Sequence, residues 1–181
     1  MAAFVVHELG HALFTAFGPG EGMAQASKEG ISRLLNAIED ARIERKLAQC
    51  STVPEARKLL EGLTSYIVER DTAAGYDLTA PKSFAFTLCN VLLTDGLGYT
   101  VPAFPAAWRH MLPAGWVRVL ENCLLALPGL NSTADALDLA RWVQREMAQG
   151  GAATPPVSTP PAKGGAGQRE GEQGEPEGAQ D

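Results

Sequence analysis

The stretch AAFVVHELGHALFTAF, Ala2–Phe17, decides how the rest of the chain is interpreted. Its centre is the pattern HExxH, formed by His7, Glu8 and His11, and a Gly-Pro-Gly segment follows at 18–20. Because glycine and proline end helices, the sequence predicts one helix over this stretch. Residues four apart lie on the same face of a helix, so both imidazoles can bind one metal ion.

Glu8 lies about 100° round the predicted helix from His7, so it can face a metal-activated water without ligating the metal. Zinc lowers the pKa of such a water to about 7, and a glutamate can accept its proton during attack on a carbonyl. With three histidines in the chain, a chance pair around a glutamate at this spacing is improbable. The apolar neighbours predict a buried helix, where imidazoles need partners. The alternative is a pair of hydrogen-bonded core histidines without metal.

A catalytic zinc site needs a third protein ligand, and the segment NAIEDARIE at 36–44 offers three carboxylates. A second helix is predicted over Ser27–Gln49. Projected at 100° per residue, Glu39 falls on the edge of its apolar arc, whereas Asp40 and Glu44 point away. Glu39 is therefore the predicted third ligand.

The same segment leaves other roles open. The choice between Glu39 and Asp40 as third ligand is not closed, and Asp40 or Glu44 can instead accept a hydrogen bond from a ligating histidine. Arg42 projects inward, where it can pair with a carboxylate or polarise a substrate carbonyl. Taken alone, this cluster is also typical of a solvated helix face with i,i+4 pairs.

The remaining ordered part is predicted to be helical, since no convincing alternating strand and no repeat occurs. Proline and glycine set the expected boundaries of the further helices, which are Pro54–Thr72, Pro81–Gly96, Ala106–Met111, Pro113–Leu127 and Ser132–Gln149. The fold class expected from this pattern is mainly α.

The composition changes near Gly150, after which Gly, Pro, Glu, Gln and Ala dominate. Such a segment buries too little apolar surface to offset the entropy of ordering, so 150–181 is expected to be a disordered acidic tail or linker. The expected organisation is one helical domain over 1–149 followed by this tail.

The bulk properties exclude several classes of protein. A net charge of −6 argues against a nucleic-acid binder, which usually carries a basic face. No apolar run is long enough for a bilayer, and no basic segment opens a signal peptide. Three cysteines without CxxC spacing are typical of reduced thiols, so a cytoplasmic protein is expected.

Two segments, HELGHALFT at 7–15 and LLNAIEDARIERKL at 34–47, resemble the metallopeptidase-like domain of phage and bacterial proteins related to the cobaltochelatase T subunit. In that group an HExxH helix is followed by an N-x-x-E-D-x-R-I-E helix, and an acidic linker and a von Willebrand factor A domain commonly come next. The resemblance implies Zn²⁺ held by His7, His11 and Glu39, with Glu8 as general base. It also implies a peptide or protein substrate, and a von Willebrand A domain or an AAA+ ATPase as partner.

The chain departs from that group in two ways. It contains no Asp-x-Ser-x-Ser metal site of a von Willebrand domain, and only six residues precede His7, where zincins have a β-sheet. The expected fold is therefore a gluzincin-type helical domain without its N-terminal sheet, in a sequence that is either a fragment or begins later than the true start.

Two other functions and four weaker site residues stay open. The chain can be a non-catalytic zinc-containing module of a chelatase-like assembly, or a helical structural protein without metal. An oxyanion-stabilising group is another open assignment, because no spacing selects among Tyr66, Tyr76, Tyr99 and His110.

Overall fold

The computed structural model describes residues 2–18, 21–50 and 55–150, and within these ranges it contains helices and no strand. The expected mainly α fold is confirmed for this part of the chain. The longer helices, in chain order, are α1 (Ala2–Phe14), α2 (Gly22–Lys28), α3 (Ser32–Ala48), α4 (Ala56–Ala73), α5 (Phe84–Val91), α6 (Trp108–Met111), α7 (Ala114–Ala126) and α8 (Thr133–Ala148). Short turns of other helix types are η1 (Pro81–Ser83), η2 (Leu92–Gly96) and η3 (Leu127–Gly129).

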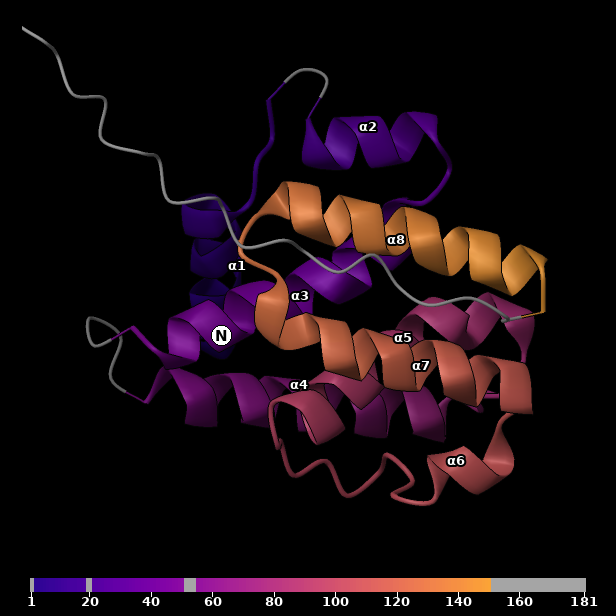
Figure 1. Cartoon of the computed structure of the whole chain (residues 1–181). Helices are drawn as coiled ribbons and strands as arrows, with labels where there is room; N and C mark the ends of the chain where they lie inside the picture. Colours follow the sequence, from indigo (N-terminus) through magenta and orange to yellow (C-terminus); the bar gives the residue numbers. More distant parts are fainter. Residues whose placement is uncertain (1, 19–20, 51–54, 151–181) are drawn as a thin grey trace, which may run out of the picture.

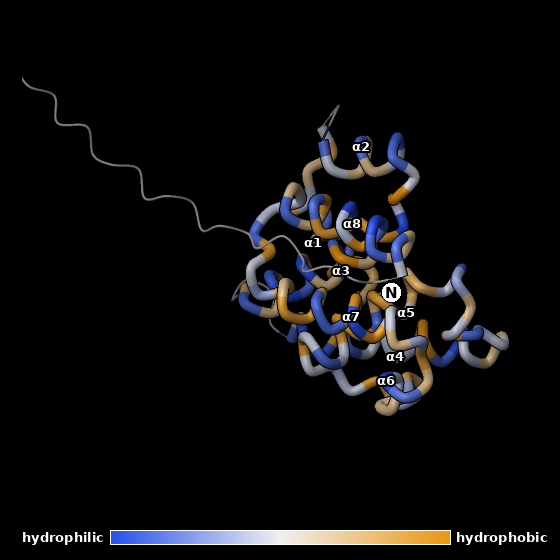
Figure 2. Tube along the Cα trace, turned by 45° about the vertical axis from the view of Figure 1, so that its right-hand side comes forward, coloured by the Kyte–Doolittle hydropathy of each residue, from blue (hydrophilic) through white to orange (hydrophobic). Residues whose placement is uncertain are grey.

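Helix α3 is the centre of the arrangement (Figure 1). Helices α1, α2, α4, α5 and α8 all pack against it, so it is enclosed on several sides. Figure 2 shows hydrophobic segments along the helices in the middle of the bundle. Because α3 is enclosed in this way, its buried residues include charged side chains as well as apolar ones. They are Leu35, Ala37, Ile38, Glu39, Ala41, Arg42, Ile43, Glu44 and Leu47. A projection that assumes a single buried arc therefore does not describe this helix.

The helix predicted over Ser27–Gln49 corresponds to α3, and its first two residues form the end of a separate helix, α2. The break lies at Gly30, whose φ of 71° is in the left-handed region that glycine adopts at low cost. The other predicted helices are present with boundaries shifted by a few residues, and the Pro81–Gly96 prediction corresponds to η1, α5 and the π-helical turn η2. The first residue of the predicted helix Pro54–Thr72 lies outside the described residues.

Helix α1 packs against both α3 and α4, and Gly10 lies close to α3. Gly10 is its buried residue, and a Cβ atom there would lie 2.6 Å from Cδ1 of Leu47, so glycine permits this close approach. The expectation that the whole helix is buried is wrong. Its outer face exposes Val5 (60%) and Leu13 (57%), because no described segment packs on that side.

Helix α8 completes the core on the other side of α3. Ser132 caps the helix in a reciprocal capping box with Asp135. Trp108 and Trp142 are buried in the core. Among the described residues, no helix combines the length and apolar character needed to cross a membrane. The predicted tail falls almost entirely on 151–181, outside the described residues.

Candidate metal centre

The two histidines of the HExxH pattern converge on one carboxylate oxygen. Oδ1 of Asp40 lies 3.1 Å from Nε2 of His11 and 3.6 Å from Nε2 of His7. The two imidazole rings meet edge to face, with 4.9 Å between their centroids. The α1 spacing of four residues and the crossing of α1 over α3 together bring these three side chains to one point.

The other nitrogen of each ring is held by a second side chain. Nδ1 of His7 lies 3.0 Å from Oε1 of Glu44, and Nδ1 of His11 lies 3.1 Å from Oγ1 of Thr15. A hydrogen bond at Nδ1 fixes the ring orientation and leaves Nε2 as the ligand atom. Glu44 thus has one of the roles left open by the sequence, in which its carboxylate accepts a hydrogen bond from a histidine.

The outer oxygen of Asp40 is fixed in the same way. Oδ2 accepts a hydrogen bond from the side-chain amide of Asn36 at 3.0 Å, and the thiol of Cys89 donates to it at 3.9 Å. Burial, with the charge of Asp40 second, raises the pKa of the Cys89 thiol well above its ordinary value, so it stays protonated. Asp40 therefore keeps Oδ1 free to face the histidines.

The donor set of His7, His11 and Asp40 fits a small divalent cation. One ligand atom from each lies within 4.8 Å of the others. A tetrahedral ion with ligand distances of about 2.0–2.1 Å needs ligand atoms about 3.4 Å apart, close to the two distances measured to Oδ1. Two imidazoles and one carboxylate leave a fourth position for water or substrate, as in catalytic zinc sites.

The local charge also favours a cation. Burial lowers the pKa of His7, but the hydrogen bond to Glu44 and the charges of Asp40, Glu44 and Glu8 outweigh it, and the pKa is raised. The same negative surroundings that attract a proton to His7 attract a metal ion, which competes with that proton for the ring nitrogen.

Glu39, the ligand expected from sequence, is not part of this cluster. Its side chain is fully buried and pairs with the guanidinium of Arg42, three residues further along α3. Arg42 also donates to the carbonyl of Phe14 at 2.7 Å, at the end of α1. The geometry thus favours Asp40 over Glu39 as third ligand. The helical projection selected Glu39 because it assumed that α3 buries a single face, whereas other helices cover α3 on several sides. The pairing of Arg42 with a carboxylate is confirmed.

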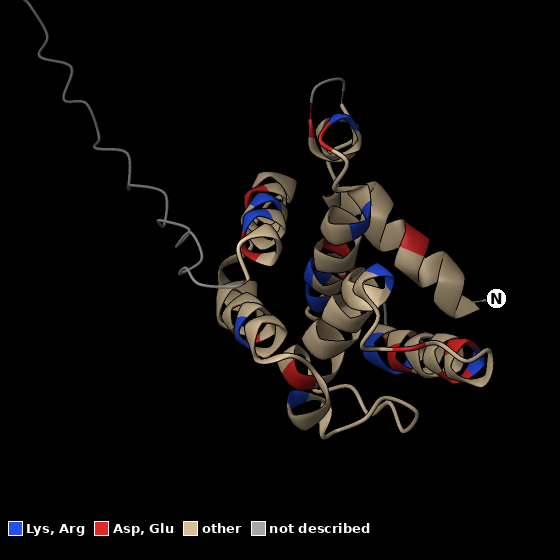
Figure 3. Cartoon of the chain, turned by 90° about the vertical axis from the view of Figure 1, so that its right-hand side faces the viewer, with Lys and Arg blue, Asp and Glu red and all other residues tan. Residues whose placement is uncertain are grey.

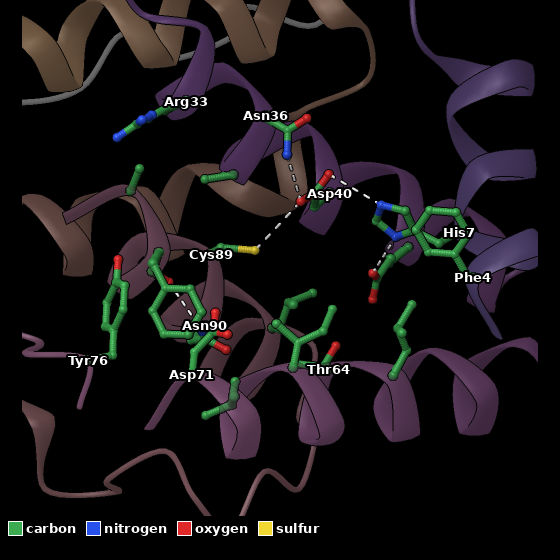
Figure 4. A pocket seen from close by; sticks show the side chains of 18 of the residues that line it. Phe4, His7, Arg33, Asn36, Asp40, Thr64, Asp71, Tyr76, Cys89 and Asn90 are labelled. Carbon is green, nitrogen blue, oxygen red and sulfur yellow. Dashed lines mark hydrogen bonds and ion pairs between the residues drawn. The ribbon is translucent and has the colours of Figure 1, made fainter. Parts of the chain in front are cut away.

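Glu8 lies on the wall of a pocket of about 680 Å³ that also reaches His7, Asp40 and Glu44. The pocket runs from α1 along α3 between α4 and α5 (Figure 4). Figure 4 shows Phe4 and His7 at one end of it. Glu8 is exposed and is not a member of the cluster itself.

The four weaker site residues have separate positions. Tyr76 lines the end of the pocket away from His7, whereas Tyr99 is buried near Glu44, whose charge, after burial, raises its pKa. Tyr66 and His110 are exposed. Neither of these two lines the pocket.

The sequence carries a signal for the carboxylate that the structure brings to the two histidines. Asn36, Asp40 and Glu44 recur every four residues, the same spacing that joins His7 to His11, so one ridge of α3 can face one ridge of α1. No known protein family, curated protein or solved structure matches the chain. The geometry of the site therefore carries the functional argument.

Proposed function

We propose that this chain is a zinc-dependent hydrolase of peptide bonds, with the metal held by His7, His11 and Asp40 and with Glu8 as general base. One observation carries the proposal. Two oriented Nε2 atoms and one carboxylate oxygen meet where a pocket ends, and a further carboxylate, Glu8, lines that pocket.

A zinc ion held by these residues would polarise a carbonyl and make water a better nucleophile at neutral pH. Glu8 accepts a proton from the attacking water and passes it to the departing amine nitrogen, so that a C–O bond forms as the C–N bond breaks. Glu44 and Thr15 keep the rings turned with Nε2 toward Asp40, at 3.0 and 3.1 Å from the two Nδ1 atoms.

The test separates metal binding from catalysis. Purified protein is expected to hold about one zinc per chain, and His7→Ala or His11→Ala to remove it. Glu8→Gln should keep the zinc and lose hydrolysis of a peptide library, whereas Glu69→Gln, a change at an exposed carboxylate outside the pocket, should keep both. Protein that takes up no zinc contradicts the proposal, as does activity that survives Glu8→Gln.

A second function is favoured by the exposed apolar face of α1. Phe4, Val5, Leu9 and Leu13 are exposed on a helix whose one charged residue is Glu8 (Figure 3). Such a face is typical of a protein–protein interface. In this alternative the zinc site is structural and the domain serves an assembly containing a von Willebrand A domain or an AAA+ ATPase. Zinc that stays bound in a protein without hydrolytic activity favours it.

A further inference from the structure

The pocket beside the metal centre has two ends of opposite charge. At the α1 end, Glu8, Asp40 and Glu44 contribute carboxylates. At the other end lie Arg33 and Tyr76, as Figure 4 shows, and Lys82 also lines the pocket. The ligand that fits such a pocket is therefore elongated, with different chemistry at its two ends.

Arg33 is a cation at that end that pairs with no other described side chain. Within the described residues it makes no hydrogen bond or ion pair, and its side chain is exposed at the pocket mouth. Lys82 differs, because its charge acts on Asp77, and Asp71, the carboxylate nearby in the lining, is paired with Arg70 at 2.7 Å. A guanidinium with no internal partner is suited to binding a carboxylate from a ligand.

The distance from Arg33 to the metal centre sets the length of that ligand. Asp40 follows Arg33 by seven residues on α3, and both line the pocket, so about 10.5 Å of helix axis separates them. An extended peptide spans at most about 3.3–3.6 Å per residue. Two or three residues therefore connect a carbonyl at the metal to a carboxylate at Arg33.

The middle of the pocket is apolar, and the described part of the chain places no strand beside it. Leu63, Ile67 and Val68 come from α4, and Ala85 and Phe86 from α5. Helical backbone groups are bonded within their helices, so they cannot align a long extended peptide as a sheet edge does. Recognition then depends on apolar side chains and on the chain end, and a volume of about 680 Å³ is that of a small-ligand pocket.

We propose that the pocket holds a short peptide with a free C-terminal carboxylate at Arg33 and apolar side chains against α4 and α5, which makes the chain an exopeptidase acting near C-termini. This inference rests on the hydrolase function proposed above. The experiment can distinguish failure of this inference from failure of the hydrolase proposal, because peptide binding at Arg33 is measured in a protein that does not cleave the peptide.

The experiment uses the zinc-loaded Glu8→Gln protein and two libraries of N-acetylated tripeptides, one with free C-termini and one with C-terminal amides. Bound peptides are identified by mass spectrometry, and calorimetry gives the affinities of the best pairs. Free acids are expected to bind at least about tenfold more tightly than the matching amides. Arg33→Gln should remove this preference, while Arg118→Gln, on the exposed face of α7 and outside the pocket, should keep it.

Three results overturn the inference: no binding of either library, equal binding of acids and amides, or a preference that Arg33→Gln leaves intact. Zinc content and hydrolysis by the wild-type protein are measured on parallel samples. A protein that prefers free acids yet holds no zinc or cleaves nothing keeps the binding of a C-terminal carboxylate at Arg33 and contradicts the hydrolase. A protein that cleaves acids and amides equally does the reverse.

Discussion

Helix α3 has two charged faces that lie back to back and are built for different purposes. The metal-side face consists of Asn36, Asp40 and Glu44. Asp40 and Glu44 contact the histidines, and Asn36 donates a hydrogen bond to Asp40. The loop-side face consists of Glu39, Arg42, Arg45 and Lys46. Its cations donate to the backbone carbonyls of Phe14, Leu127, Leu130 and Asn131.

The two faces differ in exposure. On the loop-side face the Glu39 and Arg42 side chains are 0% exposed, and each neutralises the other. On the metal-side face the side chains of His7 and Asp40 are each 16% exposed, at the end of the pocket. A sealed, neutral pair suits anchoring, whereas an accessible group suits exchange of ligands with solvent.

They also differ in the sign of their field. On the metal-side face, nearby carboxylates raise the pKa of His7 against the effect of burial. On the loop-side face, burial followed by the charges of Arg42 and Arg45 lowers the pKa of Lys46. One helix thus presents a negative field to α1 and a positive field to the 127–131 loop, and only the negative one attracts a cation.

The largest expected effect comes from breaking the loop-side pair. Glu39→Ala leaves the buried guanidinium of Arg42 without its carboxylate and should lower the free energy of unfolding by about 3–5 kcal/mol. Asp40→Ala in zinc-free protein should cost less than about 1 kcal/mol, because the carboxylate is partly exposed. Urea denaturation of both zinc-free variants measures this. A loss for Asp40→Ala as large as that for Glu39→Ala would remove the contrast between the faces.

Zinc affinity should reverse that order. Asp40→Ala should weaken binding by more than about 100-fold, beyond the range for residues that only orient a ligand. Glu39→Gln, which keeps the size of the side chain and a hydrogen bond to Arg42, should stay within a few-fold of wild type. Competition with a chelator gives both values. Zinc lost from Glu39→Gln but retained by Asp40→Ala would restore Glu39 as ligand.

The orienting partners of the histidines come next. Glu44→Gln removes the charge beside Nδ1 of His7 and should weaken zinc binding about 10–100-fold. Thr15→Val removes a neutral partner from His11 and should have a smaller effect, below about tenfold. Titration with zinc and a competing chelator compares them. If Thr15→Val has the larger effect, charge is not what distinguishes this face.

The sequence predicted those features of the site that lie within a single helix. His7, Glu8 and His11 are fixed relative to each other by the 3.6-residue period, so their grouping needs no tertiary information. The third member depends on which side of α3 meets α1, and residues one step apart, Glu39 and Asp40, point to opposite faces. Only packing on several sides of α3 decides between them.

The fold was predictable where proline and glycine mark the ends of helices, as at Pro81 and Gly96. Helix α2 was missed because it is short, and because Ser27 and Lys28, its last residues, continue without a proline toward α3. The exposure of α1 was not predictable either, because an apolar sequence does not state whether a neighbour covers it.

A smaller effect should follow from changing the contact between α1 and the metal-side face. Gly10→Ala places a Cβ 2.6 Å from Cδ1 of Leu47, and this flexible side chain must move. A loss of about 1 kcal/mol in stability and a weaker zinc site are expected, since His7 and His11 move with α1. Gly62→Ala on α4, where nothing lies within 4 Å, should instead stabilise the protein by about 0.5–1 kcal/mol. Identical behaviour of the two variants would mean that the close approach does not position the histidines.

The smallest effect concerns the loop that the loop-side face holds. Burial raises the pKa of Asp135, but hydrogen bonds from Asn131 and Ser132 and the charge of Arg42 outweigh it, so the pKa is below its ordinary value of 3.8. A lowered carboxyl pKa stabilises the fold above that ordinary value, and this stabilisation is lost as the pH falls through the lowered pKa.

Asp135→Asn should therefore lower stability by about 0.5–1 kcal/mol at neutral pH, and the gap to wild type should close below pH 3.8. Asp138→Asn removes an exposed carboxylate of the same helix and should change stability by less than about 0.5 kcal/mol at any pH. Thermal denaturation of the three proteins between neutral and acidic pH measures both gaps. A gap for Asp135→Asn that is constant with pH would show that the ionisation of Asp135 does not contribute to holding the loop.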